Sequence, residues 1–181
     1  MIKLAEPSPV WIQAPRHCPR LEFPAYRFTP GLNPHPRGNP QGHSYGQPEP
    51  HSAYFVPDRW RENTLYLFGV DLYHQGYFWE SHEAWEALWH LTDKKGVEGQ
   101  FFQGLIQNSA ALLKFHLGEK NGAGRLAREA LRRLSLVCDA RHVFFMGLAM
   151  TPLIASIERY FTPVWEANEP AGDRPRLYLE F

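Results

Sequence analysis

The distribution of proline constrains this chain more than any other feature. Eleven of its 16 prolines fall in the first 50 of 181 residues. Proline fixes φ and lacks an amide N–H, so this density excludes regular helices and central strands from that segment. We therefore expect an extended proline-rich arm over residues 1–57, followed by a domain of a different kind.

The arm also carries large aromatic side chains, which is unusual for a disordered segment. They are Trp11, Phe23, Tyr26, Phe28 and Tyr45. Disorder is the alternative, but these residues favour an arm that packs on the domain. We expect Tyr26, Phe28 and Tyr45 to lose solvent exposure there, and His35 or His43 to close over a functional site.

After Pro57 the apolar residues recur with a helical period. The first expected helix is capped by Asp58 or Asn63 and ends at Gly76. The others span residues 77–91, 97–117, 122–137 (capped by Asn121) and 151–161. Short connections predict an all-α, compact bundle of about five helices over residues 58–165, with an extended C-terminal tail over residues 166–181. The alternative is a mixed fold with short strands at 143–145 and 177–179.

Composition limits the function classes. With 44% apolar residues the chain can bury one core, and 19 basic residues balance 19 acidic ones. We therefore expect neither nucleic acid nor a membrane as a partner, and a small molecule or a second copy of the chain instead. Two cysteines without CxxC spacing, and an N-terminus without a signal-like apolar run, favour a reduced cytoplasmic protein.

The helix expected over residues 77–91 mixes aromatic with ionisable side chains. At about 100° per residue, His82 lies within the apolar stripe and Glu86 lies on its border. His82 and Glu86 are four residues apart, and Glu83 and Glu86 are three apart, so the three side chains are neighbours. One imidazole and two carboxylates form a donor set for a divalent metal ion.

Each of these residues also has a structural interpretation. Glu80 and Glu83 lie in the first turns of the helix, where acidic side chains favour the positive end of the helix dipole. His82 and Glu86 could form a structural hydrogen-bonded pair. One His and two Glu are an incomplete ligand set, so further ligands must come from elsewhere.

The helix expected over residues 97–117 offers supporting residues. Gln103 and Gln107 share one face with Gly104, which permits close approach by a neighbouring helix. The two glutamines could hydrogen-bond Glu83 and Glu86, or they could face solvent. His116 falls on the apolar side, either as a core histidine or as a site residue.

Two motifs together resemble the family known as domain of unknown function 309. They are Phe78-Trp-Glu-Ser-His-Glu-Ala-Trp-Glu-Ala-Leu-Trp89 and Gln103-Gly-Leu-Ile-Gln107, followed by Gly118 and Gly122-Ala123. The resemblance covers about residues 65–134 and implies a compact all-α fold of about five helices. It also brings the label of a metal-dependent hydrolase, for a family without an established activity. By position it implies as site residues Glu80, His82, Glu83, Glu86, Trp89, Gln103, Gln107 and His116. The chain has Asn121 one or two places later than the family pattern.

Two functional hypotheses follow. In the first, the chain is a metal-dependent hydrolase with His82 and Glu86 as ligands, Glu83 as a ligand or catalytic general base, and Gln107 as an orienting group. In the second, it is a non-catalytic binding or assembly module whose polar residues form a closed structural network.

Overall fold

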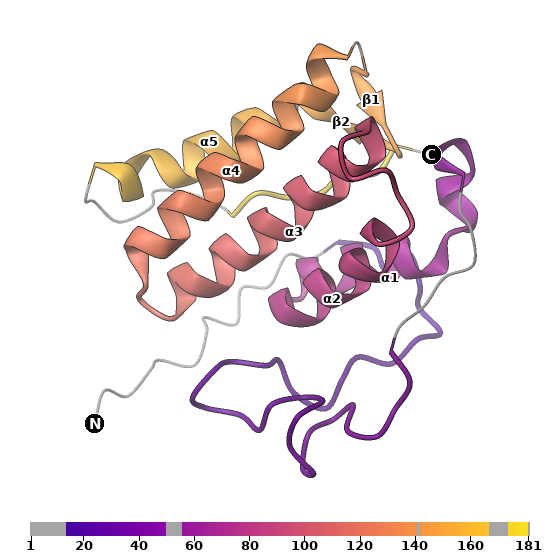
Figure 1. Ribbon diagram of the computed structural model, residues 1–181, viewed down its shortest axis with the longest axis vertical. Coiled ribbons are helices and arrows are strands. Elements are labelled where there is room, and N and C mark those ends of the chain that lie inside the picture. Colours follow the sequence, from indigo (N-terminus) through magenta and orange to yellow (C-terminus); the bar gives the residue numbers. More distant parts are fainter. Residues whose placement is uncertain (1–13, 50–55, 141, 167–173, 181) are drawn as a thin grey trace.

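A computed structural model describes residues 14–49, 56–140, 142–166 and 174–180. The all-α prediction is confirmed (Figure 1). The elements are the 3₁₀-helix η1 (Pro57–Glu62), α1 (Thr64–His74), α2 (Phe78–Trp89), α3 (Val97–His116), α4 (Lys120–Asp139), the strands β1 (Phe144–Phe145) and β2 (Leu148–Ala149), and α5 (Met150–Trp165). Within the described residues, β1 and β2 form the one sheet, an antiparallel hairpin, and Leu179 adds an isolated bridge to Leu148. None of the described helices is long and apolar enough to cross a membrane.

The ends of the first helices follow their sequence signals. Asn63 caps α1, because its side chain accepts a hydrogen bond from the Tyr66 amide at 2.9 Å. Gly76 ends the turn after α1 with φ of +77°, and Gly118 does the same after α3 with φ of +78°. This left-handed conformation suits glycine, so both positions were predictable.

Two helix boundaries were predicted wrongly. Asn121 does not cap α4, because the chain re-enters a helix directly after Gly118, with Glu119 at the cap position. Asn121 therefore lies inside the first turn. The end of α5 lies four residues beyond the predicted Phe161, since Pro163 sits in the last turn and does not stop the helix there.

The helix α3 is central to the bundle. It packs against α2 and α4, while α1 packs on α2 and α5 packs on α4 (Figure 1). The largest fully buried side chains include Trp85, Tyr66, Tyr73, Phe101 and Phe102. Gly104 does allow close helix approach, but the neighbour is α4: a Cβ there would lie 2.6 Å from Leu134 Cγ.

The contact between α1 and α2 depends on Gly69. A Cβ at this position would lie 2.3 Å from Nε1 of Trp85, whose side chain is fully buried. We therefore expect Gly69→Ala to lower the free energy of unfolding by about 1–3 kcal/mol, the usual cost of overpacking a core. Chemical denaturation would measure it. Gly122→Ala is the control, because its Cβ would meet mainly the flexible Lys114 side chain; this change should raise stability by roughly 0.5–1 kcal/mol through helix propensity.

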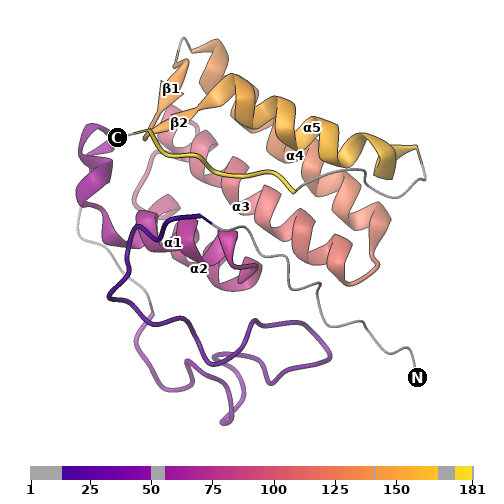
Figure 2. The same ribbon diagram turned by 180° about the vertical axis from the view of Figure 1, so that it is seen from behind.

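Two buried carboxylates hold the arm on the bundle. The side chain of Asp71 in α1 accepts hydrogen bonds from the backbone amides of His17 and Cys18, both at 2.8 Å. Glu80 in α2 accepts one from the Phe28 amide at 2.8 Å and contacts His43 Nε2 at 3.1 Å. Residues 14–49 of the arm contain no helix or strand; their first part runs beside α1 and α2, and the rest forms loops that extend beyond these helices (Figure 2).

Aromatic contacts cover the same interface. Phe23 stacks on Tyr77 at a centroid distance of 5.2 Å, and the ring of Phe28 meets Trp79 edge to face at 5.4 Å. The predicted burial of Phe28 is confirmed. Tyr26 is half-buried, whereas the prediction for Tyr45 is wrong: it lies in the outer turn of the arm and is 52% exposed. Trp11 lies outside the described residues.

The C-terminal segment is extended and crosses the bundle beside α5 (Figure 2). The Tyr73 hydroxyl donates to the Pro175 carbonyl at 3.0 Å, and the Leu177 amide donates to His74 Nε2 at 3.2 Å. Burial, with positive charge nearby, lowers the pKa of His74 to about 4. His74 is therefore neutral at pH 7 and free to accept this bond.

Candidate metal centre

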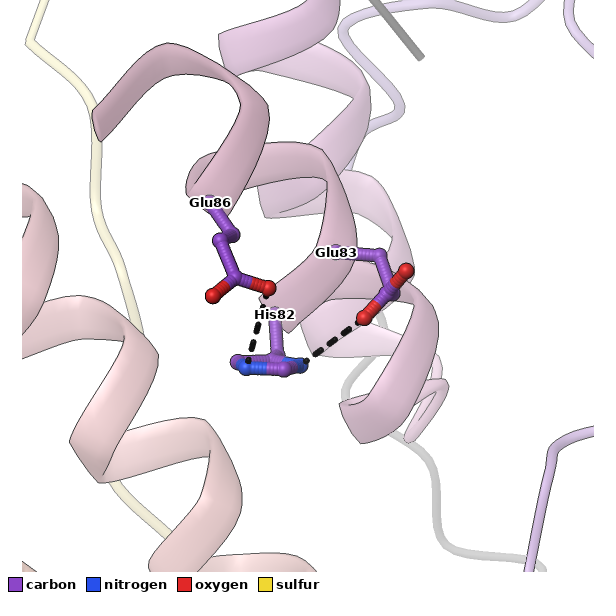
Figure 3. A group of neighbouring side chains, drawn as sticks. All are labelled: His82, Glu83 and Glu86. Carbon is purple, nitrogen blue, oxygen red and sulfur yellow. Dashed lines mark ion pairs between the residues drawn. The ribbon is translucent and has the colours of Figure 1, made fainter. Parts of the chain in front are cut away.

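The helix α2 brings His82, Glu83 and Glu86 together on one side (Figure 3). One ligand atom from each residue can be chosen so that all three lie within 4.8 Å of one another. Within the described parts of the chain, this is the one group of three or more His, Cys, Asp or Glu residues with that spacing. The i, i+1, i+4 pattern therefore produces the convergence that the sequence predicted.

The imidazole of His82 lies between the two carboxylates (Figure 3). Its Nδ1 is 3.6 Å from Glu83 Oε1, and its Nε2 is 3.7 Å from Glu86 Oε2. Both distances exceed a good hydrogen bond, so neither contact locks the ring. One ion can use only one ring nitrogen, and one nitrogen of His82 lies within 4.8 Å of an oxygen of each carboxylate.

The donor set fits a divalent ion in type and in spacing. Two bonds of about 2.0–2.2 Å separate ligand atoms by at most about 4.4 Å, so small side-chain movements suffice to close the group around an ion. Three protein donors leave at least one position for water or substrate, as in catalytic zinc sites. The side chains are 26%, 25% and 38% exposed for His82, Glu83 and Glu86, so solvent reaches them.

The surroundings of the cluster shift two of its pKa values. Burial raises the pKa of Glu83 to about 7, and the negative charge of Glu86 adds to this shift. Burial also lowers the pKa of His82, although Glu86 and a hydrogen bond to the Trp79 carbonyl oppose the change. Near neutral pH the cluster therefore contains a neutral imidazole, suited to binding a metal, and a carboxyl close to its titration point.

The arm reaches this cluster through Arg37. Its Nε lies 3.8 Å from Glu83 Oε2, and its charge partly offsets the rise in the Glu83 pKa. The sequence interpretation missed Arg37 and named His35 and His43 instead. His43 contacts Glu80, and the His35 ring packs against the rings of Phe28 and Trp79. No local pattern marks Arg37, because the contact joins residues far apart in the sequence.

Glu80 belongs to the arm interface and not to the cluster. Its side chain is 5% exposed, and burial raises its pKa, while the Phe28 amide and His43 act in the opposite direction. One of its oxygens, Oε2, is buried without a hydrogen-bond partner. The helix-dipole interpretation of Glu80 is therefore insufficient, because this carboxylate also binds the backbone of the arm.

The glutamines expected as supporting residues lie on α3, which packs against α2. Gln103 and Gln107 are half-buried, and within the described residues neither donates a hydrogen bond to Glu83 or Glu86. The Gln107 Oε1 atom is buried without a partner. His116 is exposed at the end of α3, so its placement in the core was wrong.

The raised pKa of Glu83 predicts a pH-dependent stability in the metal-free protein. A carboxyl whose pKa rises on folding stabilises the protein most below its unfolded pKa, and this contribution is lost as the pH rises through about 7. The melting temperature of Glu83→Gln should therefore rise relative to that of the wild type as the pH increases from about 4.5 to 7. Above pH 7 the difference between the two melting temperatures should stay constant. Thermal unfolding of chelator-treated protein at several pH values would measure it. A constant difference between the two proteins would contradict the assignment.

Comparisons with known proteins agree with the sequence resemblance. Residues 66–126 match the family model described as Domain of unknown function (DUF309), which spans α1, α2, α3 and the start of α4 and contains the whole cluster. The arm residue Arg37 and α5 lie outside the match. No curated protein and no solved structure matches the chain.

Proposed function

Because the chain carries a DUF309 domain, whose function is unknown, we propose its activity from the site itself: a metal-dependent hydrolase acting on a small molecule. The convergence of His82, Glu83 and Glu86 on a solvent-accessible side of α2 supports this proposal. His82 and Glu86 would hold a divalent ion. A bound ion of this kind supplies Lewis acidity and lowers the pKa of a coordinated water.

Glu83 acts as the general base in this proposal. A base works best when its pKa lies near the pH of operation, and in the metal-free protein burial raises the pKa of Glu83 to about 7. Its carboxylate takes a proton from the attacking water and holds it on an oxygen next to the site. Arg37 limits the rise in pKa and keeps part of Glu83 ionised at neutral pH.

A second candidate is a non-catalytic binding or assembly module. The buried contacts of Asp71 and Glu80 with the arm favour it, because they form a structural polar network. Asp71 and Glu80 are almost inaccessible to solvent, whereas Glu83 and Glu86 remain open to it. We therefore assign the structural role to Asp71 and Glu80, and the hydrolytic role to the cluster.

We also place the protein in the reducing cytoplasm. Cys18 and Cys138 are both free, and each is half-buried. Free thiols are typical of proteins in compartments where glutathione prevents disulfide formation.

The test combines metal content with activity. Chelator-treated protein is offered Zn²⁺, Mn²⁺ or Fe²⁺, its bound metal is measured by elemental analysis, and hydrolysis is followed on phosphate esters, carboxylic esters and amides. We expect one ion per chain and metal-dependent turnover of one ester or amide class. Glu83→Gln should lose most of this turnover while binding some metal. Failure of the wild-type protein to bind any of the three ions would overturn the proposal.

A further inference from the structure

The arm places one basic side chain at the edge of the metal cluster. Arg37 Nε lies 3.8 Å from Glu83 Oε2, and the two side chains are 21% and 25% exposed. Within the described residues, Arg37 is the one lysine or arginine that forms an ion pair with the cluster. A cationic group from a segment distant in sequence therefore lies beside the residues that α2 contributes.

The turn that carries Arg37 is ordered by its own hydrogen bonds. The backbone amides of Arg37 and Gly38 donate to His35 Nδ1 at 3.3 and 3.1 Å. The Ser44 amide donates to the carbonyl of Pro36 at 3.0 Å, and Pro36 is buried. These contacts fix the backbone at Arg37, so a ligand that binds its side chain does not first have to order a free loop.

The guanidinium group of Arg37 has N–H donors to spare. Its Nη1 donates to the Gln47 carbonyl at 3.2 Å, which orients the group without neutralising it. The distance from Nε to Glu83 is too long for a hydrogen bond. Within the described residues the group makes no other hydrogen bond or ion pair, and these contacts use only part of the donors that a guanidinium carries. Hydrogen bonds to a ligand at the cluster are therefore open to it.

A bound divalent ion would change the charge balance around Arg37. Held by His82 and Glu86, the ion would offset the two carboxylates of the cluster. The charge of Arg37 would then no longer be balanced by Glu83. The charge of Glu49 also reaches Glu83, but Glu49 is exposed, and water screens an exposed charge more than a half-buried one. The metal-loaded site therefore favours an anionic ligand.

We propose, on the basis of the proposed hydrolase function, that the substrate is a phosphate ester and that Arg37 binds its phosphate oxygens. The planar guanidinium fork matches pairs of such oxygens, whereas the reacting group of a carboxylic ester or an amide is neutral. In the reaction, the oxygen of water bonds to phosphorus and the phosphorus–oxygen bond to the alcohol breaks. The proton that Glu83 takes from water ends on the alcohol, and the second proton of water stays on the phosphate.

The experiment uses inorganic phosphate as the probe and the full chain loaded with metal. Isothermal titration calorimetry gives the affinity of the wild type, Arg37→Gln and Arg37→Lys. We expect Arg37→Gln to weaken binding about tenfold or more, since a hydrogen bond to a charged group contributes at this scale. Arg37→Lys keeps the charge but not the fork, so its affinity should lie between the other two. Arg20→Gln is the control, because Arg20 is an exposed arm residue that makes no hydrogen bond or ion pair within the described residues.

Metal content, measured first, separates this proposal from the hydrolase proposal. All variants should bind as much metal as the wild type, because Arg37 is not a ligand. A wild type without metal would overturn both proposals. If the metal-loaded wild type binds no phosphate, or if Arg37→Gln binds it as tightly as the wild type, the role of Arg37 is overturned and the metal site stands. Equal losses of affinity in Arg37→Gln and Arg20→Gln would also overturn it, since they would indicate general charge attraction.

Discussion

Replacing Glu86 by Gln should abolish stoichiometric metal binding and leave the fold almost unchanged. The substitution keeps the shape of the side chain but removes a charged ligand that lies 3.7 Å from His82 Nε2. We expect affinity to fall by about 100-fold or more, beyond the 10–100-fold typical of losing a group that only supports a ligand. Because the Glu86 side chain is 38% exposed and its contact with the neutral His82 ring is 3.7 Å long, losing this contact should cost at most about 1 kcal/mol of stability.

Both quantities are measured on the same preparations, by elemental analysis and by thermal unfolding. Glu129→Gln is the matched control, since Glu129 is a helical carboxylate on α4, 45% exposed and paired with Arg132. It should bind metal like the wild type. If the wild type binds no metal and Glu86→Gln has a much lower melting temperature, the cluster is a structural ion pair and not a metal site.

Asp71→Ala should detach the start of the arm from α1. The wild-type carboxylate is 2% exposed and accepts two backbone amides, of His17 and Cys18. Its removal leaves both donors without a partner, at about 1–3 kcal/mol for each amide that stays buried. The arm can avoid part of this cost by moving into water. We therefore expect fast exchange of the His17 and Cys18 amides, together with a lower melting temperature.

Hydrogen exchange read by mass spectrometry would show the change segment by segment. Asp58→Ala is the control, because Asp58 is an exposed acidic residue in η1 that makes no hydrogen bond or ion pair within the described residues. It should leave exchange unaltered. Slow exchange at the His17 and Cys18 amides in Asp71→Ala would mean that other contacts hold the arm.

The helices were predictable because each is marked by local signals. Apolar periodicity located α2 and α3, and Gly76 and Gly118 marked the turns that follow α1 and α3. The convergence of His82 with Glu86 was predictable for the same reason, since side chains four residues apart on a helix are neighbours whatever surrounds them. These features depend on the sequence of one helix alone.

The contacts of the arm were not predictable in this way. Asp71 and Glu80 bind backbone amides, and every residue except proline offers one, so the sequence does not single out His17, Cys18 or Phe28. The same holds for Arg37, whose partner Glu83 lies on another element. His116 was misplaced because periodicity gives the direction of a side chain but not whether a neighbouring element covers that end of the helix.

The way the arm is held has a consequence for how it can evolve. Asp71 and Glu80 bind the backbone amides of the arm, as a receptor binds the backbone of an extended peptide. These hydrogen bonds therefore do not depend on which side chains occupy positions 17 and 18. The arm is in effect a tethered peptide ligand, present at a local concentration of about millimolar or more. A free peptide of the same shape would have to outcompete that tether to reach α1 and α2. The contacts that Asp71 and Glu80 offer on α1 and α2 are thus occupied by the arm of the same chain.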